Sequence, residues 1–192
     1  GVKRVVVREV PSGATRRALI ERGDVDISFG VSDKDARELS GRDDLSVVST
    51  PIENCIYCLC PNLSFTPFKD KMVRQAVAFA LPYEEIFKLA AYGQGVPMWG
   101  ASDNSPKDIS WPQPFPYANN IEKAKELLSR TDYKKGFEVP LSINLGLSSW
   151  MEPTALLIQE GLAKIGIKAT IEKIPGANWR TAALVEKKLP SH

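Results

Sequence analysis

The sequence predicts an α/β protein in which helices flank a mixed sheet. Three observations predict this class. Strand-like and helix-like segments alternate from residue 5 to residue 60. Apolar residues then recur at helical spacing in residues 69–80 and again in 121–129. The composition, 43% hydrophobic and 25% charged over 192 residues, is that of a globular protein large enough to bury a core.

The N-terminal third predicts three strands separated by two helices. Its β-branched segments predict the strands, which are residues 5–7, 25–29 and 45–50. Helical spacing predicts the helices, which are residues 14–21 and 33–39. The first helix is expected to stop at Gly23, because glycine readily adopts the left-handed conformation of a helix end. Strand, helix, strand, helix, strand is the order of an α/β unit.

Two helices are predicted in the middle of the chain. Residues 69–80 form an amphipathic helix, with Asp70 placed four residues before Arg74 as an expected ion pair. Pro82 suits the first turn of the second helix, residues 83–91. The following stretch, residues 94–117, is rich in prolines and aromatics, which predicts a packed excursion without regular structure.

The C-terminal part again alternates helices and strands. Asn120 is expected to cap the first helix. Capping-box spacing of Ser149 and Glu152, or Pro153 in a first turn, marks the start of the second. The predicted elements are a helix 121–129, a strand 137–145, a helix from about 149 to 165, a strand 167–174 and a helix 179–187.

Several classes of site are disfavoured by the residues. The single histidine, His192, is the last residue, so Ser–His–Asp and Cys–His catalysis have no interior base, and we expect no enzyme. Cys58 and Cys60 share one face of a predicted strand and Cys55 the other, so they cannot converge on one metal. We interpret them as buried apolar cysteines and expect no metal and no cofactor. Asn62-Leu-Ser64 spells a glycosylation acceptor, which is weak evidence.

Charge and hydropathy restrict the partners. The net charge of +2 comes with no basic run longer than a pair, which does not favour nucleic acid binding. No apolar run reaches the roughly 20 residues that span a bilayer. Membrane association is therefore expected only through a partner or a lipid anchor.

Strand ends and helix starts are the candidate binding positions. In open α/β sheets, ligands gather at the carboxyl ends of strands, where aromatic rings and helix-terminal amides suit a small solute with a carboxylate. The positions are Phe29, Gly30, the cysteine strand with Cys60, Ser148, Ser149, Trp150 and Trp179. A purely structural role for Trp150 and Trp179 in the core is an equal alternative.

An ordered series of short motifs resembles the family 5 extracellular solute-binding proteins, the peptide- and nickel-binding group of ABC importers. The motifs are Gly23-Asp-Val-Asp-Ile27, a strand ending at Asn62, Pro67-Phe68-Lys-Asp70, Val73-Arg-Gln-Ala76, Glu122-Lys-Ala-Lys-Glu-Leu-Leu128 and Leu162-Ala-Lys-Ile-Gly-Ile-Lys168. Pro82 and Asn120 depart from the family, which usually has aspartate there. Both are helix starts, so the fold is unaffected.

The resemblance implies a fragment of the two-lobed periplasmic-binding-protein type II fold. Residues 1–54 would be part of the first lobe's sheet and residues 55–192 most of the second lobe. Phe29, Gly30, Cys60 and the loop 148–150 would line the ligand cleft. In some members a cysteine at the place of Cys55 forms a disulfide with one further along, which would lie beyond His192.

The implied function is the capture of peptides or similar small solutes outside the cytoplasm, in the periplasm or as a cell-surface lipoprotein, for the permease subunits of an ABC importer. One alternative is the ligand-sensing domain of a transcriptional regulator with the same fold. A second is an α/β enzyme whose site the residues do not reveal.

Overall fold

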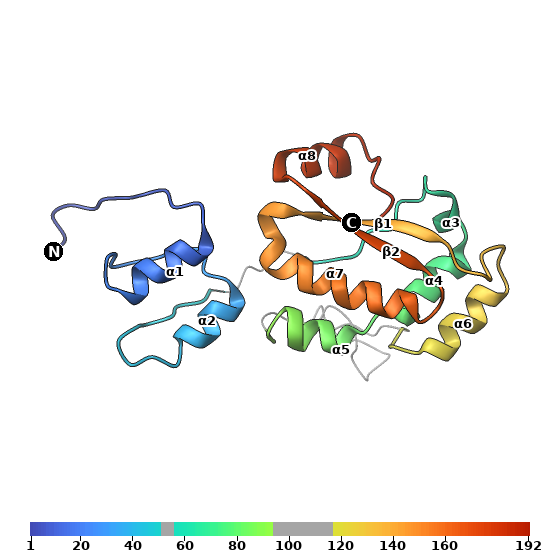
Figure 1. Ribbon diagram of the computed structural model, residues 1–192, viewed down its shortest axis with the longest axis horizontal. Helices are drawn as coiled ribbons and strands as arrows, with labels where there is room; N and C mark the ends of the chain where they lie inside the picture. The colour runs from blue at the N-terminus through green and yellow to red at the C-terminus, as the bar shows by residue number, and fades with distance from the viewer. Residues whose placement is uncertain (51–55, 94–116) are drawn as a thin grey trace, which may run out of the picture. The chain divides into compact units, whose positions relative to one another are not determined.

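The computed structural model describes residues 1–50, 56–93 and 117–192, and the chain divides into two units, residues 1–50 and 51–192 (Figure 1). The first unit holds α1, Gly13–Glu21, and α2, Asp33–Leu39. Each helix begins where the sequence places a serine cap. The Ser12 hydroxyl accepts from the Thr15 amide at 3.3 Å, and the Ser32 hydroxyl accepts from the Asp35 amide at 3.1 Å.

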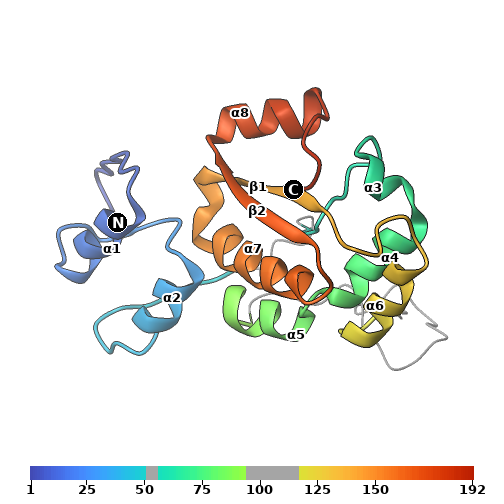
Figure 2. The same ribbon diagram turned by 45° about the vertical axis from the view of Figure 1, so that its right-hand side comes forward.

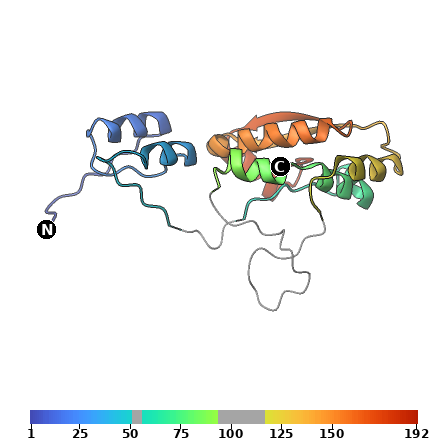
Figure 3. The ribbon, with the colours of Figure 1, turned by 90° about the horizontal axis from the view of Figure 1, so that it is seen from below.

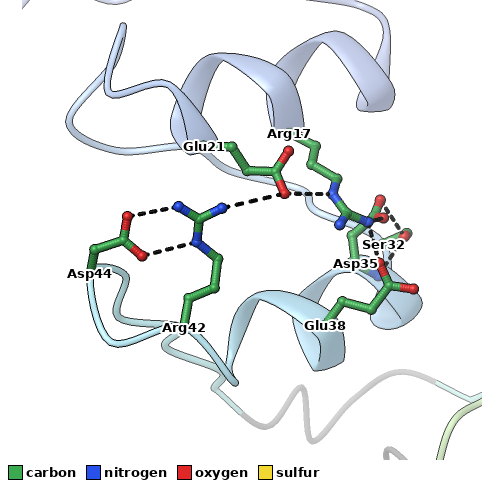
Figure 4. A network of polar contacts seen from close by, with 7 residues as sticks. All are labelled: Arg17, Glu21, Ser32, Asp35, Glu38, Arg42 and Asp44. Carbon is green, nitrogen blue, oxygen red and sulfur yellow. Dashed lines mark hydrogen bonds and ion pairs between the residues drawn. The ribbon is translucent and has the colours of Figure 1, made fainter.

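One guanidinium joins these two helices (Figure 4). Arg17 of α1 donates to Glu21 one turn along its own helix at 3.2 Å. It also donates to Asp35 of α2, and to Glu38 of α2 at 2.6 Å. These hydrogen bonds raise the pKa of Arg17 above its usual value. The charge of Arg17 is thus shared among three carboxylates on two helices.

The strands expected in the first unit are not formed. Segments 5–7, 25–29 and 45–50 carry no ladder among the residues that the structure describes. Most of their apolar side chains are exposed, with Val7 90% and Phe29 81% exposed, whereas Val25 and Leu45 are partly buried. A strand is stable only beside another strand. The prediction of these three strands was therefore wrong for this unit, because strand propensity alone does not supply a neighbouring strand to pair with.

The second unit contains helices around a short parallel sheet. Its elements are α3 Thr66–Lys69, α4 Lys71–Ala80, α5 Tyr83–Glu85, η1 Ile86–Ala90, α6 Ile121–Ser129, β1 Glu138–Asn144, η2 Leu145–Leu147, α7 Ser148–Ala163, β2 Lys168–Ile174, α8 Gly176–Arg180 and η3 Thr181–Val185. The segments η1 and η3 are π-helical turns that continue α5 and α8, and η2 is a 3₁₀ turn. No described helix is long and apolar enough to cross a bilayer.

Strands β1 and β2 pair in parallel, with Glu138 opposite Lys168 and Asn144 opposite Ile174. The inward residues of β1, which are Val139, Leu141 and Ile143, join α4, α6 and α7 in the main core. Helix α8 lies on the other side of the strands from α7 (Figures 1 and 2). Helix α5 and the turn η1 run along α7 (Figure 3). The core face of the sheet is thus covered, whereas on the other face Ser142 of β1 is buried but Thr170 and Glu172 of β2 are exposed.

Glycines permit two close approaches in this unit. A Cβ on Gly136, before β1, would lie 1.8 Å from the carbonyl oxygen of Gly166, before β2, and both glycines have positive φ. A Cβ on Gly161 of α7 would lie 2.4 Å from the carbonyl oxygen of Ala80 at the end of α4. These contacts fix the start of the parallel pair and the distance between α7 and α4.

The last residues of the chain lie between the cysteine segment and β1. The Cys60 amide donates to the His192 carbonyl at 2.7 Å. The Ser142 amide of β1 donates to the Ser191 carbonyl at 3.0 Å. Pro61 and Ser191 form an antiparallel bridge, which is the part of the predicted cysteine strand that pairs.

Two local predictions about helix starts were wrong. Asp70 does not pair with Arg74 but caps α4, accepting from the Met72 amide at 2.7 Å, because a free helix amide is the nearer donor. Arg74 donates instead to the carbonyl of Phe68 at 2.7 Å. Helix α7 begins at Ser148 without a side-chain cap, so the capping box of Ser149 is absent.

Other predicted elements are confirmed with small shifts. The Asn120 side chain caps α6, accepting from the Lys123 amide at 2.9 Å, as expected. The last helix begins at Gly176, before the expected residue 179, because Pro175 precedes it with a fixed φ. The proline-rich stretch is outside the described residues, apart from Tyr117.

Candidate functional site

The carboxyl ends of β1 and β2 lie side by side, and each leads into a helix. Asn144 and Ile174 are opposite one another at this edge. The chain enters α7 through η2 after Asn144, and α8 through Pro175 after Ile174. The Asn144 side chain accepts from the Gly146 amide at 2.8 Å, which shapes the first turn. Two helix starts therefore meet at one sheet edge, the place where α/β sheets bind ligands.

The first turn of α7 presents unpaired backbone groups of both kinds. It has no side-chain cap and no acidic residue. The Ser148 amide donates to the Leu145 carbonyl of η2, whereas the amides of Ser149 and Trp150 have no partner within α7. Pro153 lies inside the helix and has no N–H, so it cannot donate to the Ser149 carbonyl. Thr154 donates instead to the Trp150 carbonyl through its hydroxyl, at 2.8 Å. The turn therefore offers backbone amides that can donate to an anion, and beside them the Ser149 carbonyl that can accept a hydrogen bond.

An aromatic pair lies beside this turn. The rings of Tyr57 and Trp150 have centroids 4.0 Å apart at an angle of 54°. Tyr57 remains 64% exposed, so the pair presents an apolar surface to solvent. Sequence reasoning missed Tyr57. The available signal was its position in the cysteine segment, where it alternates with Cys58.

The other predicted residues of this unit lie in a second neighbourhood. Trp179 of α8 donates from Nε1 to the Ser142 carbonyl at 3.4 Å, and its ring lies edge-on to His192 with centroids 5.6 Å apart. Trp179 packs against a small cluster with Ala182, Ala183 and Leu189. These contacts show that Trp179 packs, and its role in ligand binding stays a prediction. Burial lowers the pKa of His192 below its usual value.

The cysteines differ from expectation. Cys58 is exposed and Cys60 is partly buried, so the interpretation as buried apolar cysteines is wrong for Cys58. Their sulfur atoms are 3.2 Å apart, which confirms that they share one side of the segment. Burial, with the hydrogen bond to Cys58, raises the pKa of Cys60 to about 11. Cys55 is outside the described residues, which contain no cluster of three metal-ligating side chains.

Phe29 and Gly30 belong to the first unit. The Phe29 ring is 81% exposed, and Gly30 has a φ of 65°. The Gly30 carbonyl accepts from the Arg16 guanidinium at 2.9 Å. Gly30 thus has a left-handed backbone conformation in a segment without regular structure, and the Phe29 ring is exposed to solvent. Its role in ligand binding stays a prediction, as does that of Cys60 and of residues 148–150.

Comparisons with known proteins match nearly the whole chain. The family model of the bacterial extracellular solute-binding proteins, family 5 middle region, matches residues 1–190. The glutathione-binding protein GsiB of Pectobacterium atrosepticum is 29% identical over 181 residues, which are 94% of this chain and 34% of GsiB. The oligopeptide-binding protein AppA of Bacillus subtilis is 30% identical over 206 residues, covering 94% of this chain and 37% of AppA.

A solved structure agrees in fold. The dipeptide-binding protein of Pseudoalteromonas sp. SM9913, in complex with Met-Leu, superposes with a TM-score of 0.73 at 25% identity, covering 95% of this chain and 36% of that protein. The chain thus spans about a third of the length of these relatives. They are solute-binding proteins and give no support to the regulator alternative. The chain belongs to the bacterial extracellular solute-binding proteins of family 5.

Proposed function

We propose that the full-length protein captures short peptides, or small solutes with a similar carboxylate, outside the cytoplasm and delivers them to the permease subunits of an ABC importer. The observation that carries the proposal is the family match over residues 1–190, together with relatives named for glutathione, oligopeptides and a bound dipeptide. The protein does no chemistry on the solute, and its location is the periplasm or the outer face of the cell membrane.

The first turn of α7 supports this proposal by its chemistry. Backbone amides at a helix start, together with the helix dipole, favour a carboxylate. The Ser149 carbonyl, which Pro153 cannot bond, accepts from an amide or ammonium group. A peptide carries both kinds of group, whereas a simple sugar carries neither charge. The turn therefore suits a zwitterionic or amide-bearing solute.

The aromatic pair supports the same class of solute. Tyr57 and Trp150 give an apolar surface next to the polar turn, and aromatic rings accept apolar side chains of different shape without requiring hydrogen bonds. Backbone contacts would then fix the peptide while the rings tolerate varied side chains. This division of tasks fits a transport protein that takes up a class of solutes.

The test is calorimetric titration of the full-length protein with Met-Leu, glutathione and longer peptides, each with a free and an amidated C-terminus. We expect saturable binding to the free peptides and at least tenfold weaker binding after amidation, about 1.4 kcal/mol, because the carboxylate loses its charge. Trp150→Ala should weaken binding by a similar factor.

A matched control lies on the same helix. Leu156 is 52% exposed, so Leu156→Ala should leave binding unchanged. Equal affinities for the free and the amidated peptides would contradict the role of the α7 turn. If no peptide binds to protein that circular dichroism shows to be folded, the proposed function is contradicted.

A further inference from the structure

The extended segment around residue 59 directs two thiols to one side. Its side chains alternate, so neighbours point in opposite directions. Leu59 packs against the main core, and Tyr57 contacts Trp150. Cys58 and Cys60 therefore point away from the side that Leu59 and Tyr57 occupy, and their sulfur atoms lie 3.2 Å apart.

A disulfide bond between Cys58 and Cys60 is geometrically unfavourable. Residues two apart in an extended chain have Cα atoms about 6.7 Å apart. That separation lies at the upper end of the roughly 4.4–6.8 Å found in disulfides, and the sulfurs would have to close to about 2.05 Å. The Cys60 amide is hydrogen-bonded to the His192 carbonyl at 2.7 Å, which opposes the backbone movement needed. The geometry favours two separate thiols.

The distance between the two sulfur atoms also indicates which coordination geometry a metal or metalloid atom bound by both thiolates would have. With sulfur bonds of about 2.3 Å, the length found for zinc, a linear centre spaces its two sulfurs by about 4.6 Å and a tetrahedral centre by about 3.8 Å. A pyramidal centre with angles near 90° spaces them by about 3.3 Å. The 3.2 Å between Cys58 and Cys60 is nearest to the pyramidal case.

We infer that Cys58 and Cys60 form a chelating site for trivalent arsenic of the monosubstituted type, R–As. The described residues supply no third ligand, which suits a centre that takes two sulfurs and keeps its own substituent. With an arsine oxide, two As–S bonds form and the arsenic–oxygen bonds break. The two thiol protons leave with the oxygen as water, and no electron is transferred.

Access and preorganisation agree with this assignment. Cys58 is exposed, so an arsenical reaches it first, and the partly buried Cys60 then closes the chelate. Because the second sulfur is already in place, ring closure is intramolecular, and the pair should bind at least about 10²-fold more tightly than one thiol. This inference is independent of the proposed transport function, since it uses neither the α7 turn nor a solute.

The test uses phenylarsine oxide on the reduced full-length protein, followed by intact-mass spectrometry. We expect one phenylarsenic group per chain, with two hydrogens lost and two thiols protected from alkylation. A dithiol should release it, whereas a monothiol at equal thiol concentration should not. Cys58→Ser and Cys60→Ser should each weaken binding about 10²-fold or more.

Cys55→Ser is the matched control and should retain full binding. Undiminished binding in either Cys58→Ser or Cys60→Ser would overturn the chelate, as would loss of binding in Cys55→Ser. A Cys58–Cys60 disulfide in protein purified in air without reductant would also overturn the inference, because the strand geometry argues against that bond. Thermal unfolding of each variant checks that it is folded.

Discussion

The side-chain amide of Asn62 holds the backbone carbonyl of Lys187 at 2.7 Å, across 125 residues of sequence. The same amide donates to the Leu189 carbonyl at 3.0 Å. Lys187 has a φ of 51°, a left-handed conformation that is unfavourable for a lysine. Asn62 therefore fixes a strained turn that brings the last residues of the chain back to the sheet.

Asn62→Ala should destabilise the chain by about 2–3 kcal/mol, because three hydrogen bonds worth about 1 kcal/mol each are lost: the two to the Lys187 and Leu189 carbonyls and the one that Asn62 accepts from the Ser64 amide at 2.9 Å. Urea unfolding monitored by tryptophan fluorescence measures the change. Ser64→Ala is the control, since it removes the same glycosylation signal without touching these contacts, and it should be neutral. Lys187→Gly should stabilise by about 1 kcal/mol by relieving the left-handed conformation. Equal effects of the Asn62 and Ser64 changes would refute the role of the amide.

Gly161→Ala should destabilise by about 1–3 kcal/mol, because the added methyl group would meet the Ala80 carbonyl oxygen at 2.4 Å. The expected measurement is a lower midpoint in thermal unfolding. Gly13→Ala in α1 is the matched helical control. Its Cβ meets nothing closer than 3.5 Å, so helix propensity alone should make it neutral or slightly stabilising. A neutral Gly161→Ala would show that α7 can move away from α4.

The pKa values of Asp35 and Asp44 in the first unit test whether each carboxyl group depends on its own arginine partner. Burial disfavours ionisation of Asp35, but hydrogen bonds from Ser32 and Arg17 outweigh it and lower its pKa. The Arg42 hydrogen bonds lower the pKa of Asp44 in the same way. Both folded-state values lie below the unfolded ones, so these contacts stabilise at neutral pH and are lost as the pH falls through the folded pKa values.

NMR titration of the side-chain carboxyl carbons measures both groups directly. Arg17→Met should raise the titration midpoint of Asp35 and leave that of Asp44 in place, and Arg42→Met should do the reverse. If either variant moves both midpoints together, the two ion pairs are not separate.

Cys60 should alkylate slowly. Burial and the hydrogen bond to Cys58 raise its pKa to about 11, so only a small fraction is thiolate at pH 8. Mass spectrometry after timed iodoacetamide treatment should show Cys60 reacting at least tenfold more slowly in folded than in urea-unfolded protein. Cys58→Ala should increase the alkylation rate of Cys60, because it removes the hydrogen-bond partner that raises the pKa of Cys60. Equal rates for Cys60 in folded and unfolded protein would contradict the raised pKa.

The helices could be predicted because their signals are local. Asn120 caps α6 as expected, and the apolar spacing of residues 72–80 marks α4, whose Val73 and Val77 are buried. Caps and helical periodicity act within a few residues, so the sequence alone contains them.

The candidate site depends on contacts that are distant in sequence. Trp150 could be proposed from its position after a strand, but its partner Tyr57 comes from a segment far away along the chain. The start of α7 had competing signals in Ser149 and Pro153, and the turn through η2, shaped by Asn144, decides it. The strands of the first unit have the expected residues, but pairing is a property of neighbours and not of the segment itself.

The exposed valines of the first unit have a practical consequence for handling the chain. Residues 5–7 are three consecutive β-branched residues in an extended segment, each at least 68% exposed. Unpaired segments of this kind readily add to one another between molecules. Purified chain should therefore self-associate as concentration rises. Charged substitutions at Val5 or Val7 should keep the purified chain dispersed.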